Sequence, residues 1–309
     1  MAKVAVFGAS GRQGLAQVRQ LIRAGHQVRA LSRSPDPFYG EALEAEVVPA
    51  DLRDEASLDA ALRGVDAAFF NHPVRESRQR VEWVDRVGRA AKRAGVKRVV
   101  WNTSSWIPDR AGDPGDYGMN TEAINALWRT GAPATVFGSV LFMDNLLTNW
   151  AFDFIVREDR YVYPHNPFLQ ANWISLDDVA KFMIAALDRP DLEGAWLNIG
   201  GPERLTPPQV AEILSGVVGR PIAFDPCTPA QFGKLLADAF GDTIGPDEHK
   251  ALSERIASFY VYNNFAPTTP FVVDMEPVLR RIPIKLETMR EWAARQNWRP
   301  TNAPRPPAG

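Results

Sequence analysis

Apolar positions along the first half of the chain follow two alternating patterns. Short, almost continuous apolar runs predict strands at 3–7, 27–31, 47–49, 65–70, 98–102 and 134–137. Between them, apolar residues recur every three or four positions and predict helices, among them 58–62, 81–94 and 120–129. Runs such as Ala67 to Phe70 are apolar throughout, which is typical of parallel strands covered on both faces. The pattern predicts the α/β class, with a doubly wound parallel sheet.

The second half of the chain has shorter predicted helices with strong start signals. Thr206–Gln209 and Thr228–Gln231 each place a capping threonine before a proline, with glutamine at the third helical position. Aromatic residues gather at 142–168 and 259–271. We expect a smaller C-terminal α+β lobe over the carboxyl ends of the strands, where open α/β sheets bind ligands. The expected division is a sheet domain of 1–138 plus about 170–200, a substrate lobe of 139–169 and 201–298, and a proline-rich tail of 299–309.

Three evenly spaced glycines mark the turn that leaves the first strand and opens an amphipathic helix. In a dinucleotide-binding turn, the first glycine permits the sharp exit and the second lets the backbone approach a pyrophosphate. The third lets the helix pack closely on the sheet, and the first-turn amides then meet the phosphates. The alternative is a glycine-rich turn with no ligand. The residues predicted to bind the cofactor here are Gly8, Ser10, Gly11, Arg12, Gln13 and Gly14.

The residues after the second strand indicate which dinucleotide is bound. A carboxylate at this place would hold the ribose 2′-hydroxyl of NAD, but no carboxylate occurs before Asp36. Instead Arg33 stands between two serines and offers a planar fork to a 2′-phosphate. Arg12 could bind the same phosphate from the other side. The sequence therefore favours NADP(H), although each arginine could also be a solvated surface residue.

Composition narrows the classes of function. The chain has 309 residues and a net charge of −2, which gives no reason to expect a nucleic acid or a membrane surface as partner. It has one cysteine, Cys227, and no apolar stretch of membrane-spanning length, and its first strand leaves no room for a signal peptide. We expect a cytoplasmic protein, monomeric or homodimeric. No metal is expected, because neither H-E-x-x-H nor C-x-x-C occurs.

Several segments together resemble the NmrA-like branch of the atypical short-chain dehydrogenase/reductases. Besides the glycine turn, they are 28–33, Asp51-Leu52, 142–147, 174–180, 198–203 and 219–222. The resemblance runs over nearly the whole chain. It implies a Rossmann domain that binds NADP(H) and a small C-terminal substrate lobe. Members of the family are either reductases of aromatic, quinone or unsaturated small molecules, or redox-sensing regulators without turnover.

The chain departs from the wider superfamily in one catalytic feature. Many members place tyrosine and lysine four residues apart on one helix, where the lysine lowers the pKa of the tyrosine and holds the nicotinamide ribose. Here Thr121 stands four places after Tyr117, and no lysine occurs between Lys97 and Lys181. Tyr117 remains a candidate proton donor. Asn120 occupies the place where NmrA-like members often have lysine, and it either holds the ribose or is simply the first residue of a helix.

The ends of two further strands carry the other candidates. Ser105 is the closest match to the superfamily serine that hydrogen-bonds a substrate carbonyl, or else a turn serine. His72 could relay protons near the cofactor, or be a surface histidine, and His165 is a second possible proton donor among aromatics. The remaining residues predicted to bind the cofactor are Asp51, Leu52, Asn71, His72, Pro73 and Thr103.

Two principal functions fit these features. The first is an NADPH-dependent reductase of a hydrophobic aromatic, quinone or polyketide-like small molecule, because the aromatic segments supply apolar walls and hydride transfer depends chiefly on positioning. The second is a non-catalytic NADP(H) sensor that regulates a protein partner, which the missing lysine favours. A third is an isomerase or lyase that uses the cofactor structurally.

Overall fold

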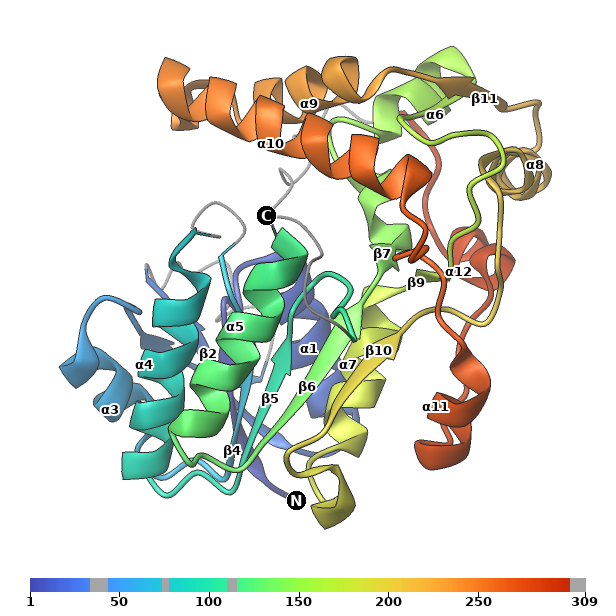
Figure 1. Cartoon of the computed structure of the whole chain (residues 1–309). Coiled ribbons are helices and arrows are strands. Elements are labelled where there is room, and N and C mark those ends of the chain that lie inside the picture. The colour runs from blue at the N-terminus through green and yellow to red at the C-terminus, as the bar shows by residue number, and fades with distance from the viewer. Residues whose placement is uncertain (34–43, 74–77, 110–115, 301–309) are drawn as a thin grey trace.

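The computed structural model describes residues 1–33, 44–73, 78–109 and 116–300, and one seven-stranded sheet forms its centre (Figure 1). The strands are β1 (Lys3–Phe7), β2 (Gln27–Ser32), β3 (Ala45–Pro49), β4 (Ala67–Asn71), β5 (Arg98–Asn102), β6 (Ala134–Ser139) and β10 (Trp196–Ile199). Their order is β10-β6-β5-β4-β1-β2-β3, and every neighbouring pair is parallel. This order confirms the predicted doubly wound Rossmann sheet.

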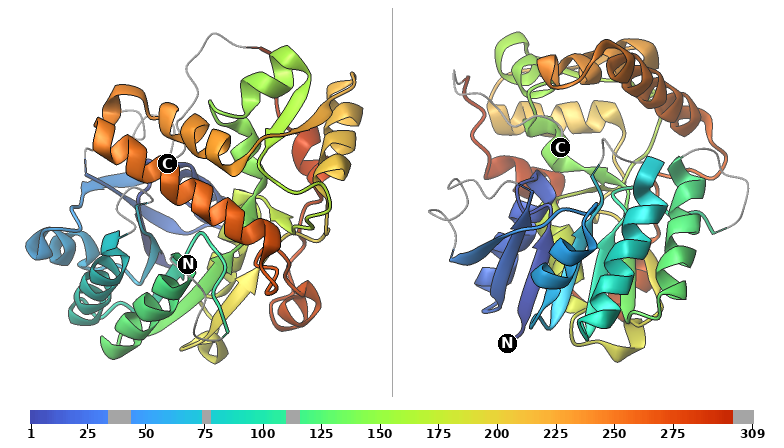
Figure 2. Two further views of the ribbon diagram at one scale, coloured as in Figure 1. Left: turned by 45° about the horizontal axis from the view of Figure 1, so that its top comes forward. Right: turned by 90° about the vertical axis from the view of Figure 1, so that its left-hand side faces the viewer.

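Helices cover both faces of this sheet. α1 (Arg12–Arg23) packs beside α7 (Leu176–Ala185) on one face, and α4 (Arg80–Arg93) packs between α3 (Glu55–Leu62) and α5 (Asp116–Arg129) on the other (Figures 1 and 2). Along β1, Val4 and Val6 face the α1 side, whereas Ala5 and Phe7 face the α4 side. Burial of both faces explains why the strands are apolar at successive positions.

The lobe lies over the carboxyl ends of the parallel strands, as predicted, and all views agree on this placement (Figures 1 and 2). Besides α7 and β10 of the sheet domain, the elements that follow β6 are β7 (Leu141–Phe142), η2 (Met143–Leu147), α6 (Phe152–Glu158), β8 (Arg160–Tyr163), β9 (Trp173–Ile174), η3 (Pro190–Leu192), α8 (Pro207–Val218), β11 (Ala223–Pro226), α9 (Pro229–Asp238), η4 (Gly241–Thr243), α10 (Pro246–Phe265), α11 (Met275–Arg281) and α12 (Met289–Ala294). β8 pairs in parallel with β11, and β7 pairs with β9. α9 and α10 pack lengthwise against each other and span the top of the lobe in Figure 1.

The start signals of the lobe helices are confirmed, but the expected helix length is not. Thr206 and Thr228 cap α8 and α9 through complete capping boxes. The expectation of short helices in this half is wrong for α10, which has 20 residues. Its apolar positions form no single stripe, because one side contacts α9 and another contacts a cavity. Gly233 of α9 permits the close contact, since a side chain there would clash with the backbone of Ser253 in α10.

The hydrophobic core continues from the sheet into the lobe. One cluster of buried residues runs from Val4 in β1, through Phe137 in β6, to Trp292 and Trp298 near the end of the described chain. The predicted domain boundaries therefore separate segments that share a core, and they stay a prediction. No helix in the described parts of the chain combines the length and apolarity that a membrane crossing needs.

The start of α5 differs from the prediction in a way that matters for the site. The helix begins at Asp116 and not near Asn120. Asn120 therefore lies in the second turn of α5 and is fully buried, so the interpretation of Asn120 as a helix-start residue is wrong. The sequence pattern missed the first turn because Asp116 and Gly118, both poor helix formers, interrupt it.

Candidate active site

The glycine turn between β1 and α1 gives each glycine a different role. Gly8 has φ +63°, a left-handed conformation that favours glycine. A side chain on Gly14 would clash with the backbone of Gly8 and Ala9, so this glycine permits the tight passage of helix over turn. Gly11 has φ −78°, which any residue adopts, and a Cβ there would reach only ordinary contact, 3.4 Å from the Gly8 oxygen. The described protein does not itself require glycine at position 11, whereas a ligand against the backbone would.

The first turn of α1 is suited to bind an anion. Gly11 is its N-cap residue and contributes no capping side chain. In the described contacts, the backbone amides at positions 12–14 have no acceptor, while the amide of Leu15 is bonded to the Gly11 oxygen. Free amides at the positive end of a helix are a binding site for phosphate. The turn therefore fits the diphosphate of a dinucleotide, with Ser10 exposed beside it.

The two arginines predicted to share a 2′-phosphate point to different places. Arg33 is exposed directly after β2, next to the strand ends where the adenosine half of a dinucleotide binds in this fold. Arg12 instead donates through Nη1 to the backbone oxygen of Asp144 (2.9 Å) and contacts Asn145, both in η2. The interpretation of Arg12 as a second clamp on the 2′-phosphate is therefore not supported, because its guanidinium is bound to the lobe. Ser34 and Asp36 lie outside the described residues.

Amide side chains connect the glycine helix to the ends of the central strands. Gln17 and Asn71 exchange hydrogen bonds of 3.0 and 2.9 Å across α1 and β4. Gln13 accepts a hydrogen bond from Asn102 at the end of β5 (2.7 Å) and donates one to the Ser104 hydroxyl (2.9 Å). Ser104 has φ +59°, an uncommon left-handed conformation for a serine. These bonds fix the turn against the strand ends from which the candidate catalytic residues project.

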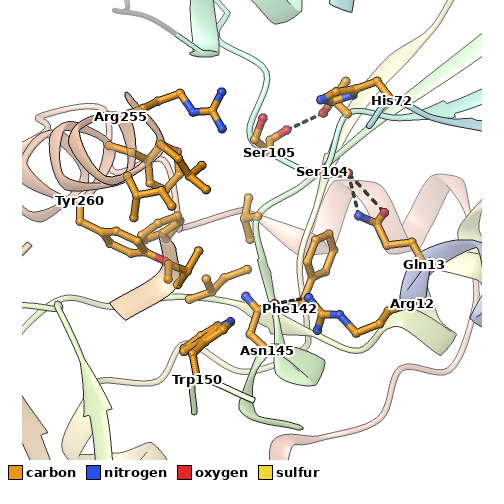
Figure 3. A pocket seen from close by; sticks show the side chains of 18 of the residues that line it. Arg12, Gln13, His72, Ser104, Ser105, Phe142, Asn145, Trp150, Arg255 and Tyr260 are labelled. Atoms are coloured by element: carbon orange, nitrogen blue, oxygen red, sulfur yellow. Dashed lines mark hydrogen bonds between the residues drawn. The ribbon is translucent and has the colours of Figure 1, made fainter. Parts of the chain in front are cut away.

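A cavity of about 230 Å³ lies where the turn and these strand ends meet the lobe (Figure 3). Its sheet-side wall comprises Arg12, Gln13, His72, Arg80, Thr103, Ser104 and Ser105. Its lobe-side wall is mostly apolar and comprises Val140, Leu141, Phe142, Asn145, Trp150, Tyr163, Leu176, Leu236, Phe240, Leu252, Arg255, Ile256, Phe259, Tyr260 and Phe271. An apolar chamber with a few polar groups on one wall is typical of a small-molecule site.

Arg80 joins three of the predicted residues in one buried network. Its Nη1 donates to Asn120 Oδ1 (2.5 Å) and its Nε to His72 Nε2 (3.1 Å). Asn120 Nδ2 in turn donates to the Ser105 hydroxyl (2.9 Å) and to the Trp106 oxygen (2.9 Å). Since the Ser105 hydroxyl accepts from Asn120, its own hydrogen can be donated into the cavity. A guanidinium from α4 thus stands beside the position where the sequence lacks the superfamily lysine.

The family follows from comparison along the whole chain. A family model described as the NmrA-like family matches residues 1–293. This chain belongs to the NmrA-like family. The resemblance seen in the sequence is thereby confirmed, and the Rossmann sheet with its lobe is the fold expected of a member.

Named relatives of this NmrA-like protein include two reductases. An NAD(P)H azoreductase of Xenophilus azovorans is 30% identical over 264 residues, which cover 80% of this chain and 89% of that protein. The (4-alkanoyl-5-oxo-2,5-dihydrofuran-3-yl)methyl phosphate reductase of Streptomyces griseus subsp. griseus is 31% identical over 224 residues, 72% of this chain and 76% of that protein. The crystal structure of Citrobacter sp. triphenylmethane reductase with NADP(H) has a TM-score of 0.72 at 18% identity, covering 94% of this chain and 98% of that one. At that identity the structural likeness shows the fold alone.

Tyr117 does not line the cavity of this NmrA-like protein. Its hydroxyl donates to Asn263 Oδ1 (2.8 Å) from α10, and its ring packs against Trp106 and Phe259. The residue is 2% exposed. Its role as proton donor is therefore not supported, since the phenol links α5 to the lobe.

The other predicted residues divide into those at the cavity and those behind it. Thr103 lines the cavity, but its hydroxyl donates to the Ser105 oxygen (2.5 Å) and stabilises the turn. Asp51 follows β3, and its carboxylate accepts the amide of Arg53 (2.9 Å). Leu52 and Pro73 are half-buried at the ends of β3 and β4, away from the cavity wall. Their roles toward a cofactor stay predictions.

Burial sets the protonation states around the cavity. His72 is 5% exposed, so its interpretation as a surface histidine is wrong, and burial together with the charges of Arg80 and Arg255 holds its pKa well below the usual value. The ring is neutral, with Nε2 accepting from Arg80 and the hydrogen on Nδ1. Burial lowers the pKa of His165 to about 3, and this residue lies behind the cavity wall, so it is no proton donor at neutral pH.

Two acidic groups near η2 are also shifted by burial. The pKa of Tyr163 is raised to about 12, and its hydroxyl accepts a hydrogen bond from Asn145 (3.4 Å). The pKa of Asp144 is raised to about 6, although its carboxylate accepts the amide of Leu176 (2.9 Å) at the start of α7. Asp144 thereby ties the lobe to α7 of the sheet domain, whereas Tyr163 makes its contact within the lobe. Within the described residues, no cluster of His, Cys, Asp or Glu could hold a metal ion.

Proposed function

We propose that this NmrA-like protein is an NADPH-dependent reductase of a hydrophobic aromatic, quinone or polyketide-like small molecule. The observation that carries the proposal is the position of the cavity, which has the glycine turn on one wall and aromatic side chains on the other. The Xenophilus azovorans and Streptomyces griseus relatives support the proposal, because both are named as reductases. A single cysteine supports the reducing cytoplasm as its compartment.

The glycine turn and Arg33 fit different parts of NADP(H). The amides at positions 12–14 would bind the diphosphate, and Arg33 the 2′-phosphate. NADPH, when bound, supplies the hydride. The chain's own part is to orient the acceptor between the aromatic side chains of the lobe and to keep water from the cavity.

Ser105 is the residue that we assign to the acceptor. Its hydroxyl accepts from Asn120 and donates its hydrogen to the acceptor's carbonyl oxygen, where negative charge develops during reduction. Asn120 and Arg80 hold this hydroxyl in place from behind and act as positioning residues. The positive charge of Arg80 favours the developing oxyanion through the network. In place of the superfamily tyrosine and lysine, water protonates the oxyanion after hydride transfer and completes the reduction.

The test follows NADPH absorbance with a panel of quinones and enones. We expect NADPH oxidation with at least one acceptor class, and a kcat about 10²-fold lower in Ser105→Ala, as for loss of one donor to an oxyanion. NADP⁺ affinity of Ser105→Ala, measured by calorimetry, should equal that of the wild type. NADPH binding without oxidation of any acceptor would overturn the proposal and favour the sensor, which a partner pull-down in NADP⁺ against NADPH would then identify.

A further inference from the structure

The charged side chains that line the cavity all have the same sign. Among the described lining residues they are Arg12, Arg80 and Arg255, and no carboxylate lines the cavity with them. Three guanidinium groups around a chamber with mostly apolar walls favour an anionic group inside it, and the carboxylate of Asp144 offsets the charge of Arg12 alone. Such a chamber suits a ligand that combines a ring system with an anionic group.

Arg12 and Arg80 both donate hydrogen bonds to neighbouring groups of the protein. Arg12 is held by the backbone oxygen of Asp144, and Arg80 by Asn120 and His72. These contacts fix the guanidinium of Arg80 on the sheet side and that of Arg12 against η2 of the lobe. They also offset part of the cost of burying the two cations, although Nε of Arg12 has no acceptor among the described residues.

Arg255 enters the cavity from the opposite side. It lies on the face of α10 that also presents Leu252 and Phe259, at helical spacings of three and four residues, and Ile256 lines the cavity beside them. In Figure 3 its guanidinium reaches from α10 toward the wall that bears Ser105. A charged residue in the middle of an otherwise apolar helix face breaks the local pattern, and such breaks are typical of functional positions.

The field of Arg255 extends across the chamber. His72 lies on the opposite wall. The charge of Arg255, like that of Arg80, lowers the pKa of its imidazole. Two walls of the cavity are therefore close enough to act on one ligand. An anion between them would be stabilised from both sides.

We propose that the acceptor carries a carboxylate, sulfonate or phosphate group, that Arg255 binds this group, and that the aromatic side chains hold the rest of the molecule with its reducible end at Ser105. This inference rests on the proposed reductase function. It names the substrate class for the same site, an anionic aromatic or enone, and it assigns Arg255 as the residue that determines the preference.

The first experiment compares a neutral acceptor with its charged analogue. NADPH oxidation is measured with 1,4-naphthoquinone and with 1,4-naphthoquinone-2-sulfonate in the wild type and in Arg255→Gln. We expect KM for the sulfonate to rise tenfold to a hundredfold, as for loss of a charge-assisted contact, while KM for the neutral quinone changes less than twofold. Arg255→Lys should recover part of the sulfonate affinity, because it restores the charge without the planar fork.

Lys250→Gln is the matched control. It removes one positive charge from the same helix at an exposed position outside the cavity lining. If it shifts KM for the sulfonate as much as Arg255→Gln does, the effect comes from overall charge and the inference is wrong. Equal changes for both quinones in Arg255→Gln would overturn it as well.

A binding measurement separates this inference from the reductase proposal. Calorimetry with naphthalene-2-sulfonate, which cannot be reduced by hydride, tests the anion site in the protein saturated with NADP⁺. Arg255-dependent binding in the absence of any NADPH oxidation would retain the anion site and remove the reductase function. Oxidation of neutral quinones with no sulfonate binding would retain the reductase and overturn the anionic substrate class.

Discussion

Placing a lysine at position 120 tests the buried network most directly. In a superfamily scaffold this change would restore the usual cation, but here the position is already beside Arg80, with Nη1 2.5 Å from Asn120 Oδ1. Two like charges about 4 Å apart repel by about 4 kcal/mol at an effective dielectric constant near 20. Neutralising the lysine instead would cost about as much, since a fall in its pKa from about 10.4 to 7 corresponds to about 4.6 kcal/mol. We expect Asn120→Lys to be about 4 kcal/mol less stable than Asn120→Met.

Urea unfolding of the two variants measures this difference. Asn120→Met is the matched control, because it has similar length and loses the same hydrogen bonds without adding charge. The folded-state pKa of the new lysine lies below its unfolded value, so the penalty is present at neutral pH and is relieved as the pH rises toward about 10. The gap between the variants should therefore narrow from pH 7 to pH 9.5. Equal stability of both variants at pH 7 would refute the placement of Arg80 against residue 120.

Three further predictions concern the turn and its surroundings. Gly11→Val should abolish NADP⁺ binding in calorimetry and leave the melting temperature near that of the wild type. Gly14→Ala should lower the melting temperature, because only a side chain at position 14 clashes with the protein backbone. Equal melting temperatures of the two variants would contradict this. Arg33→Ala should weaken NADP⁺ binding by roughly tenfold to a hundredfold and leave NAD⁺ binding unchanged, and equal losses for the two cofactors would remove its role. The pKa of Asp144 is raised to about 6, above its unfolded value, so the wild type loses stability as the pH rises from 4 to 6. In urea unfolding, the stability of Asp144→Asn relative to the wild type should increase from pH 4 to pH 6. A stability difference that stays constant over this interval would contradict the burial of this carboxyl.

The fold and the cofactor turn could be predicted because their signals are local. A glycine at each of the positions 8, 11 and 14, with a strand before and a helix after, is readable within the first 25 residues. The structure gives Gly8 its expected conformation and Gly14 its expected close contact, whereas the role of Gly11 toward a ligand stays a prediction. The same holds for the capping boxes at Thr206 and Thr228, which depend on neighbours three residues away.

The chemistry of the cavity could not be predicted because tertiary contacts create it. Arg80 reaches Asn120 across 40 positions, and Tyr117 finds its partner Asn263 across 146. One signal was available for Arg80, since it falls on the buried stripe of α4 with Trp83, Val84 and Val87 and so places a charge where an apolar residue is expected. Nothing in the sequence near Arg12 shows that its side chain would turn to η2.

Part of the lobe-side wall of the cavity is one uninterrupted stretch of chain, from the start of α9 to the end of α10, which supplies Leu236, Phe240, Leu252, Arg255, Ile256, Phe259 and Tyr260. Its two helices brace each other through the contact at Gly233, while the cofactor turn lies at the opposite end of the sequence. A single recombination event could therefore replace this part of the wall as one segment and leave the glycine turn unchanged. We expect sequence differences between family members to concentrate in this segment. Grafting residues 229–265 from one member onto another is then the shortest way to exchange their substrate preferences.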